Sequence, residues 1–278
     1  MSKLTISAFA KMKEEGKKVT YITAYDAQIS RIAQSAGIDM ILVGDSVGNN
    51  ILGYNSTHPV TMDDMIRHSS AVRRGALETF VIGDLPFLSY QASNEDAIYN
   101  SGRFIKESGM DAVKCEGGRR MAERVKAIND AGIAVMGHIG YTPQSTNFKR
   151  IVQSKSVEAY KELLKDARAL QDAGAFAILL EAVPNVPAGQ IAKKLEIPIY
   201  GIGSGKEVDG VLAIVNDVIG LGTFKSKFVK SFCNAEMFIK GGIDEYIASV
   251  RKGEFPSAEH FYSCDSRVEE EIINLEND

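Results

Sequence analysis

The stretch DAVKCEGGRRMAERVKAINDAGIAVMGHIG, residues 111–140, indicates the fold class of this chain. It begins with a short apolar run, continues as a longer amphipathic segment, and returns to a second apolar run after the sequence DAG. A glycine at that place favours the end of a helix, because glycine adopts a left-handed backbone without a steric penalty. The stretch therefore predicts a strand, a helix and a second strand, the repeating unit of parallel sheets.

The same unit recurs along the chain, and its helix ends repeat as SAGID, ESGMD, DAGIA and DAGAF. The apolar runs predict strands at 19–25, 39–45, 79–86, 111–118, 134–140, 176–184 and 197–205, and an eighth near 211–221. Such runs need cover on both faces. Seven or eight units in about 220 residues fit a (β/α)8 TIM barrel better than an open sheet.

No linker rich in Pro, Gly or Ser divides the chain, so we expect a single barrel domain over residues 1–278. The segment TISAFAKMKEEG (5–16) predicts an extra helix before the first strand, and residues from about 222 predict a C-terminal helical extension. Residues 265–278 contain six acidic residues and one Arg, and form an acidic tail.

Composition excludes several classes of protein. A net charge of −4 is too acidic for a general nucleic-acid binder, and the three cysteines have the spacing neither of a disulfide framework nor of a zinc site. No apolar run of about 18 residues is present, so we expect no membrane span. These features predict a cytoplasmic protein with reduced thiols.

Polar residues follow the apolar runs of five candidate strands. In a TIM barrel the chemistry gathers at the carboxyl ends of the strands, so a polar residue there points to function more than one elsewhere. These strand-end residues are Asp45, Ser46, Asp84, Lys114, Glu116, His138 and Glu181.

Asp45, Asp84 and Glu116 end three consecutive strands, and clustered carboxylates do not all stay ionised in a confined site without a cation. All-oxygen ligands favour Mg²⁺ over zinc. We therefore predict a magnesium site. The alternative is that these acids cap neighbouring helices.

The other strand-end residues predict substrate contacts. Lys114 lies inside an apolar run, where its ammonium needs an anion, supplied either by a substrate or by a structural partner such as Glu116. His138 is interpreted as a donor to a substrate oxygen, or as a hydrogen-bonded core histidine. Glu181 follows an apolar run without Lys or Arg nearby, which favours a general base, or else a partner for a buried donor.

Two further features carry weaker signals. His58 lies in a Thr-His-Pro turn and His68 on a helix face, so both predict plain surface roles. The GIGSG segment, residues 201–205, is compatible with an anion site or with a tight turn after the seventh strand.

The chain resembles the ketopantoate hydroxymethyltransferase family of the phosphoenolpyruvate mutase/isocitrate lyase superfamily. The resemblance extends from about residue 4 to 260 and rests on an ordered set of motifs. These are ITAYD (22–26), LVGDSVG (42–48), STHPVTMDDMIRHSSAVRRGA (56–76), IGDLPF (82–87), VKCEGG (113–118), GHIGYTPQS (137–145) and LLEAVP (179–184).

The resemblance implies roles for the same residues. Asp45 and Asp84 match direct Mg²⁺ ligands, and Glu116 matches a ligand that acts through water. Ser46, Asp84, Lys114 and His138 match positions around the 2-oxo acid, and Glu181 matches the base.

The implied reaction enolises 3-methyl-2-oxobutanoate (2-oxoisovalerate) with Mg²⁺ and transfers a one-carbon group from 5,10-methylenetetrahydrofolate to give ketopantoate. A homo-oligomer, in this family a decamer, is also implied. The alternatives are a related Mg²⁺-dependent 2-oxo-acid lyase or aldolase with another electrophile, and a barrel that serves only as a binding subunit.

The chain departs from the family pattern in three places. The loop 146–156 lacks the family's glycines and contains Lys149, Arg150 and Lys155, cations that attract an acidic co-substrate or form a solvated loop. Asn216 and Asp217 replace a His-Asp pair, and Ser226 replaces a proline. The departures therefore concern the donor more than the 2-oxo acid.

Overall fold

In the computed structural model, which describes residues 3–145, 152–222 and 226–275, eight parallel strands close into a barrel. Strand order follows chain order, and the last strand pairs with the first. The strands are β1 (Val19–Thr23), β2 (Met40–Val43), β3 (Phe80–Asp84), β4 (Ala112–Glu116), β5 (Val135–Gly140), β6 (Ala177–Glu181), β7 (Ile199–Ile202) and β8 (Gly210–Ala213). The predicted (β/α)8 barrel is confirmed, but the eighth strand is shorter than predicted near 211–221, because residues 215–219 form a helix.

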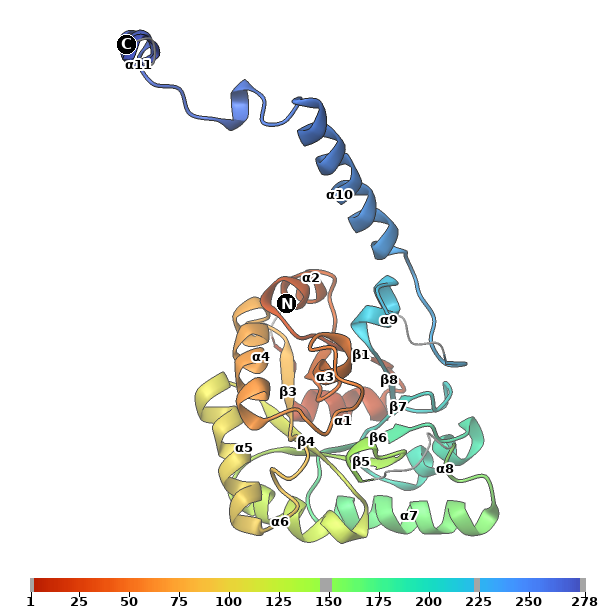
Figure 1. The fold of residues 1–278 in the computed structure, drawn as a ribbon. Helices are drawn as coiled ribbons and strands as arrows, with labels where there is room; N and C mark the ends of the chain where they lie inside the picture. The colour runs from red at the N-terminus through yellow and green to blue at the C-terminus, as the bar shows by residue number, and fades with distance from the viewer. Residues whose placement is uncertain (1–2, 146–151, 223–225, 276–278) are drawn as a thin grey trace.

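Helices surround the barrel and precede and follow it along the chain (Figure 1). The α-helices are α1 (Ile6–Glu14), α2 (Ala27–Ser35), α3 (Val47–Asn50), α4 (Met62–Gly75), α5 (Asn94–Ser108), α6 (Ala122–Asp130), α7 (Val157–Asp172), α8 (Asn185–Lys194), α9 (Val215–Ile219), α10 (Ala235–Lys252) and α11 (Ser266–Leu275). The 3-10 turns are η1 (Arg119–Met121), η2 (Pro143–Ser145) and η3 (Ala258–His260). Helix α3 lies inside a segment that the sequence predicts as loop, and a short turn without a helix joins β7 to β8.

Local sequence signals explain where the helices begin and end. Thr61 and Asp64 form a capping box at the start of α4, in which each side chain accepts the other's backbone N–H. The repeated glycines after α2, α5, α6 and α7 all have positive φ angles, between 66° and 93°. These glycines release the chain directly into the next strand, as the repeated motif predicts.

Alternate strand residues fill the barrel interior, because side chains of a strand point to opposite faces in turn. Phe80 and Ile82 of β3 point inward, whereas Val81 packs against the outer helices. Helix α1 closes the amino-terminal end of the barrel, where the Phe9 ring meets the Phe80 ring edge-on at 5.2 Å. This apolar filling leaves the carboxyl ends of the strands for polar groups.

Along these strands the inward-facing residues change from apolar to charged towards the carboxyl end. Residue 84 follows 80 and 82 on β3, and residues 114 and 116 follow 112 on β4. In β5 the inward pair is Met136 and His138. The charged residues therefore form a layer directly above the apolar interior.

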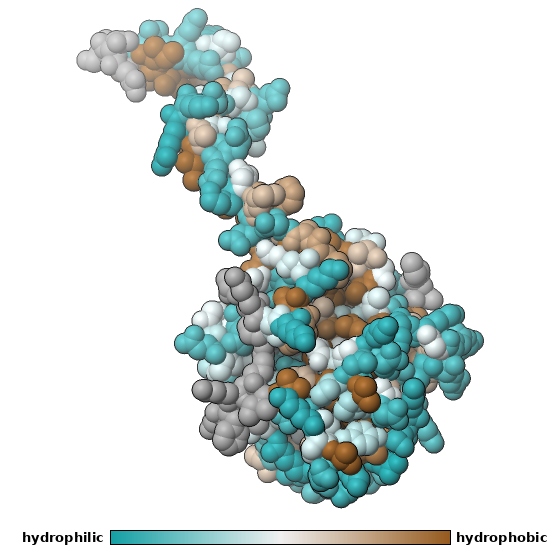
Figure 2. Space-filling model, turned by 90° about the vertical axis from the view of Figure 1, so that its right-hand side faces the viewer, coloured by the Kyte–Doolittle hydropathy of each residue, from teal (hydrophilic) through white to brown (hydrophobic). Residues whose placement is uncertain are grey.

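The C-terminal extension projects away from the barrel as an arm formed by residues 235–275 (Figure 1). None of the residues of α10 or α11 is buried, and apolar side chains remain exposed along the arm (Figure 2). Across the residues that the structure describes, no helix combines the length and apolar character that a membrane span requires.

Candidate active site

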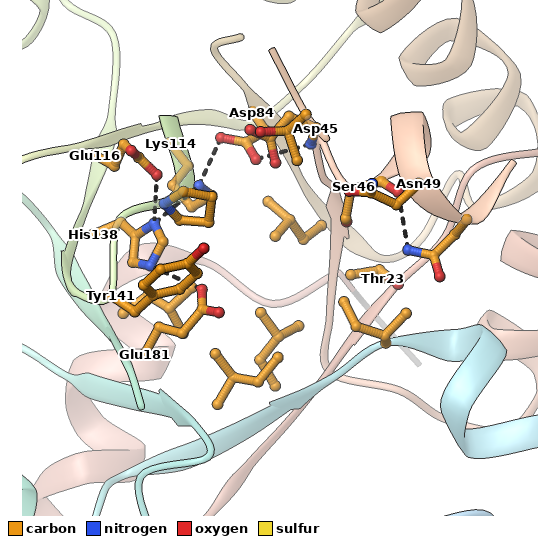
Figure 3. Close-up of a pocket in the computed structure, with 18 of the residues that line it drawn as sticks. Thr23, Asp45, Ser46, Asn49, Asp84, Lys114, Glu116, His138, Tyr141 and Glu181 are labelled. Carbon is orange, nitrogen blue, oxygen red and sulfur yellow. Dashed lines mark hydrogen bonds and ion pairs between the residues drawn. The ribbon is translucent and has the colours of Figure 1, made fainter. Parts of the chain in front are cut away.

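A cavity of about 620 Å³ opens at the carboxyl ends of the strands. All seven strand-end residues singled out from the sequence line it, namely Asp45, Ser46, Asp84, Lys114, Glu116, His138 and Glu181. Figure 3 shows Glu116, Lys114, His138 and Glu181 on one side of the cavity and Ser46 on the other. The barrel thus brings together residues that lie up to 136 positions apart in the sequence.

Asp84 and Lys114 form a buried ion pair, because the strand register places these two residues side by side. The Lys114 Nζ lies 2.7 Å from the Asp84 Oδ1, and both side chains are almost fully buried. The other oxygen, Asp84 Oδ2, accepts a hydrogen bond of 3.0 Å from the backbone N–H of Asp45. Burial lowers the pKa of Lys114, but the carboxylates of Asp84, Asp45 and Glu116 outweigh it and raise that pKa.

His138 lies between two carboxylates. Its Nδ1 is 3.5 Å from Glu116 Oε2, and its Nε2 is 3.3 Å from Glu181 Oε2. Burial and the Lys114 charge lower the pKa of His138, but Glu116 and Glu181 outweigh them and raise it to about 9. The imidazole is therefore protonated at neutral pH, and the two carboxylates balance its charge. Burial raises the pKa of Glu116, but His138 and Lys114 outweigh it and lower that pKa.

Asp45 is the least compensated acid of the cavity. Gln144 Nε2 donates a hydrogen bond of 2.8 Å to its Oδ2. Burial, together with repulsion from Asp84, nevertheless raises the pKa of Asp45 to about 7. This corner of the site therefore has an excess of negative charge.

Ser46 follows Asp45 at the amino end of α3. Its Oγ lies 2.8 Å from the hydroxyl of Tyr25, the buried tyrosine that follows β1. The Tyr25 contact orients the serine hydroxyl at the edge of the cavity.

The sequence interpretation missed several residues of the site. Tyr25 follows the first strand, and the strand-end rule applied to that strand would have found it. Gln144 and Ser145 lie in the motif GHIGYTPQS, but the sequence interpretation gave them no role. Ser145 Oγ donates a hydrogen bond of 3.0 Å to Glu116 Oε1. Tyr90 lies in the loop after β3, and no sequence pattern points to it.

The structure corrects two interpretations, those of His58 and His68, and it adds a contact at Glu181. The neighbour of Glu181 is His138, and the Glu181 side chain is 12 % exposed. His58 lines the cavity, with its ring 4.8 Å from that of Phe87, and half-buried His68 meets the carbonyl oxygen of Tyr25 through Nδ1 at 2.6 Å. Neither histidine is a plain surface residue.

Three sequence features remain, namely the GIGSG segment, the pair at 216–217 and the altered loop 146–156, and the structure does not describe all of that loop. The GIGSG segment comprises the end of β7 and the bend after it, in which Ser204 Oγ donates to the Leu180 carbonyl oxygen. Asp217 lines the cavity, and Asn216 precedes it in α9. Lys149 and Arg150, the cations expected in the altered loop, lie outside the described residues.

The donor chemistry of the site fits a hard divalent cation. Among the described residues no three Asp, Glu, His or Cys side chains converge closely enough to enclose an ion. Five carboxylates, including that of Asp217, nevertheless share the cavity with two cationic side chains, those of Lys114 and His138. Asp45 and Asp84, already in contact, offer oxygen atoms that a divalent cation would neutralise.

The raised pKa of His138 predicts that the stability of the metal-free protein depends on pH. Its folded pKa, about 9, exceeds the unfolded value of 6.5, so its stabilisation is complete below pH 6.5 and is lost as the pH rises through about 9. The raised pKa of Asp45 acts in the same direction, but between pH 3.8 and about 7. The decrease above pH 7 should therefore belong to His138.

Urea unfolding with a chelator, from pH 7 to about 9, measures this effect. His138→Gln should flatten the decrease in the free energy of unfolding over that range. His260→Gln, on the exposed turn η3, is the matched control and should keep the original slope. An unchanged slope in His138→Gln would contradict the assignment.

Comparisons with known proteins identify the family of the chain. The family model for ketopantoate hydroxymethyltransferase matches residues 3–258. A 3-methyl-2-oxobutanoate hydroxymethyltransferase of Clostridium botulinum (strain 657 / Type Ba4) is 47% identical over 275 residues, which cover 97% of this chain and 98% of that protein. The protein of the same name from Carboxydothermus hydrogenoformans is 46% identical over 277 residues, covering 98% of this chain and 100% of that protein.

Solved structures support the fold at much lower identity. A 2,3-dimethylmalate lyase of the PEP mutase/isocitrate lyase superfamily superposes with a TM-score of 0.59 at 16% identity, covering 98% of this chain and 95% of that chain. A phosphonopyruvate hydrolase in complex with oxalate and Mg²⁺ has a TM-score of 0.59 at 14% identity, and the match covers 98% of this chain and 94% of that chain. The match over nearly the whole length, with an identity near 46%, shows that the chain belongs to the ketopantoate hydroxymethyltransferase family and is an enzyme, a hydroxymethyltransferase.

Proposed function

We propose that this enzyme converts 3-methyl-2-oxobutanoate, 5,10-methylenetetrahydrofolate and water into ketopantoate and tetrahydrofolate, for pantothenate biosynthesis. The observation that carries the proposal is the layer of charged groups at the barrel mouth, in which Lys114 and Glu181 face one cavity beside the carboxylates of Asp45, Asp84 and Glu116. Family membership supports the same reaction.

The cavity suits a small molecule with one charged and one apolar end. Its charged wall carries Lys114 and His138, which bind the oxygen atoms of an oxo acid. Apolar side chains complete the lining, and they suit the isopropyl group; they are Leu42, Leu179, Ile202, Leu212 and Ile214.

Asp45 and Asp84 would hold Mg²⁺ directly, and Glu116 would hold it through water. When bound, Mg²⁺ supplies Lewis acidity that stabilises negative charge on the keto oxygen. Asp84 also holds Lys114 through the 2.7 Å ion pair, so the ammonium stays beside that oxygen.

The protein's own groups position the substrate and move its proton. Ser46 Oγ binds the substrate carboxylate, and protonated His138 donates to a substrate oxygen. Glu181 removes the proton from C3, since the 3.3 Å contact with His138 Nε2 holds its carboxylate at the cavity wall.

Water adds to the methylene carbon of the folate, both C–N bonds of that carbon break, and the two protons of the water go to the two nitrogens, which leaves formaldehyde and tetrahydrofolate. The carbon nucleophile then forms a C–C bond with the formaldehyde carbon, and the oxygen of that group takes up the proton that Glu181 removed from C3. The hydroxymethyl group of ketopantoate therefore receives its oxygen from water.

A product assay tests the proposed reaction. The enzyme is incubated with 3-methyl-2-oxobutanoate and either 5,10-methylenetetrahydrofolate or free formaldehyde, and ketopantoate is measured by mass spectrometry. We expect product with the folate at a kcat/KM well above that with formaldehyde. Equal use of formaldehyde would favour an aldolase, and cleavage of 2-oxo acids without transfer would favour a lyase.

We also propose that the enzyme is a homo-oligomer, and the exposed arm supports this. Helix α10 carries an exposed apolar stripe at helical spacing, formed by Ile239, Ile243, Tyr246, Ile247 and Val250. A stripe of this kind is unfavourable in water unless another surface covers it. A second copy of the chain supplies such a surface.

Sedimentation measures the assembly. The double variant Ile243→Lys and Ile247→Lys places charges in the stripe and should shift the mass towards the monomer. Glu245→Lys, also exposed on α10, is the control and should keep the original mass. An unchanged mass in the double variant would contradict an interface at this stripe.

A further inference from the structure

Tyr90 is fully buried behind the cavity wall, and its hydroxyl contacts the strand that carries Glu116. The hydroxyl oxygen accepts a 3.0 Å hydrogen bond from the backbone N–H of Glu116. Its own hydrogen is within reach of Gln144 Oε1 at 2.8 Å and of the Glu116 carbonyl oxygen at 3.1 Å. The shorter contact joins Tyr90 to Gln144.

The amide of Gln144 has one orientation only. Its Nε2 donates to Asp45 Oδ2 at 2.8 Å and to the Leu85 carbonyl oxygen at 2.9 Å. Its Oε1 accepts from the Tyr90 hydroxyl and from Gln91 Nε2, the latter at 3.1 Å. A flipped amide would set oxygen against two acceptors and nitrogen against the Gln91 donor, so the network fixes the orientation.

The two side chains therefore form a continuous bridge between two carboxylate-bearing segments. One end is the backbone of Glu116 on β4, and the other is the carboxylate of Asp45, which follows β2. Strand β3, with Asp84 at its end, lies between β2 and β4 in the barrel. The bridge therefore spans the part of the barrel mouth that carries the three acids.

Neither Tyr90 nor Gln144 is among the residues that line the cavity, so a direct contact with substrate is not their role. Both are almost completely buried, and a buried polar side chain is costly unless its hydrogen bonds are made. Here every bond of the pair is directed at an acid-bearing segment or at its neighbours. This is the arrangement of groups that orient metal ligands from behind.

We propose that Tyr90 and Gln144 are positioning residues that hold the Asp45 carboxylate and the backbone of Glu116 in place on either side of Asp84, and so set the affinity of the enzyme for a divalent cation. This inference rests on the proposed magnesium site. It adds two residues that act through the Asp45 carboxylate and the Glu116 backbone.

Calorimetric titration of the metal-free enzyme with Mg²⁺, and with Mn²⁺ as a spectroscopic substitute, tests the bridge. Tyr90→Phe removes the hydroxyl, and Gln144→Met removes the amide at similar volume. Each should weaken metal binding by about 10- to 100-fold, the range found for groups behind metal ligands. The double variant should be hardly weaker than either single one, since one break already interrupts the bridge.

Tyr200→Phe is the matched control, because its buried hydroxyl has no hydrogen-bond partner among the described residues. It should bind metal as the original enzyme does. Saturating Mg²⁺ should restore most of the kcat of Tyr90→Phe, since the bridge acts through metal binding, whereas a general folding defect would not respond. Urea unfolding of each metal-free variant shows whether that variant folds. If one single variant does not fold, the metal affinity of the other single variant tests the bridge.

Asp84→Asn separates the two proposals. If it binds metal as tightly as the original enzyme, the magnesium site itself is wrong. If it loses metal while Tyr90→Phe and Gln144→Met keep affinities close to the original, the bridge is overturned and the proposed reaction stands. Strictly additive losses in the double variant would also overturn the bridge.

Discussion

Asp84→Asn is expected to lower kcat/KM for hydroxymethyl transfer by about a thousandfold, or ~4 kcal/mol of transition-state stabilisation. Asp84 is one of the buried acids, and its carboxylate pairs with Lys114 at 2.7 Å and accepts the Asp45 N–H. Asparagine keeps the size but removes the charge. The variant therefore loses the proposed Mg²⁺ ligand and the partner that holds the Lys114 ammonium in place.

Initial rates at several Mg²⁺ concentrations measure the effect. Asp63→Asn, at an exposed ion pair on α4, is the control and should keep near-original rates. A chelator should abolish the activity of the original enzyme, and added Mg²⁺ should restore it. Full activity after complete removal of divalent ions would end the metal proposal.

Glu181→Gln is expected to slow the exchange of the C3 hydrogen of 3-methyl-2-oxobutanoate by about 10²- to 10⁴-fold, the usual contribution of a positioned base. Glutamine fits the same space at the end of β6 beside His138, but its amide has no proton affinity comparable to that of a carboxylate. Binding of metal and substrate should therefore change little.

Proton NMR in deuterated water follows the exchange without the folate, so it isolates proton removal from one-carbon transfer. Glu196→Gln, exposed before β7, is the control and should exchange at the original rate. Exchange in Glu181→Gln at the original rate would assign proton removal to another group of the cavity.

Several features of the fold were predictable because they depend on local chemistry. Each repeated Ala-Gly or Ser-Gly pair requires a left-handed residue, and Gly37, Gly109, Gly132 and Gly174 all adopt it. The alternation of strand residues places Lys114 and Glu116 on the same face. A closed parallel barrel then gathers all strand ends at one mouth, so Asp45, Asp84 and Glu181 share one cavity.

Other features of the site depend on which loops meet, and no local pattern encodes that. Glu181 read in its own segment is a carboxylate after an apolar run, and only the pairing of β5 with β6 brings His138 to it. The turn after β3 and the turn after β5 place Tyr90 against Gln144, 54 residues away in the sequence. Gln144 in turn reaches Asp45 across 99 residues.

The sequence by itself therefore determined the barrel and the chemical types at its mouth, since strand alternation, helix caps and strand ends are set by neighbouring residues. The tertiary structure decided which charges pair and which side chains support them. Hydrogen bonds and ion pairs act over about 3 Å, and such contacts between distant segments exist only once the barrel has closed.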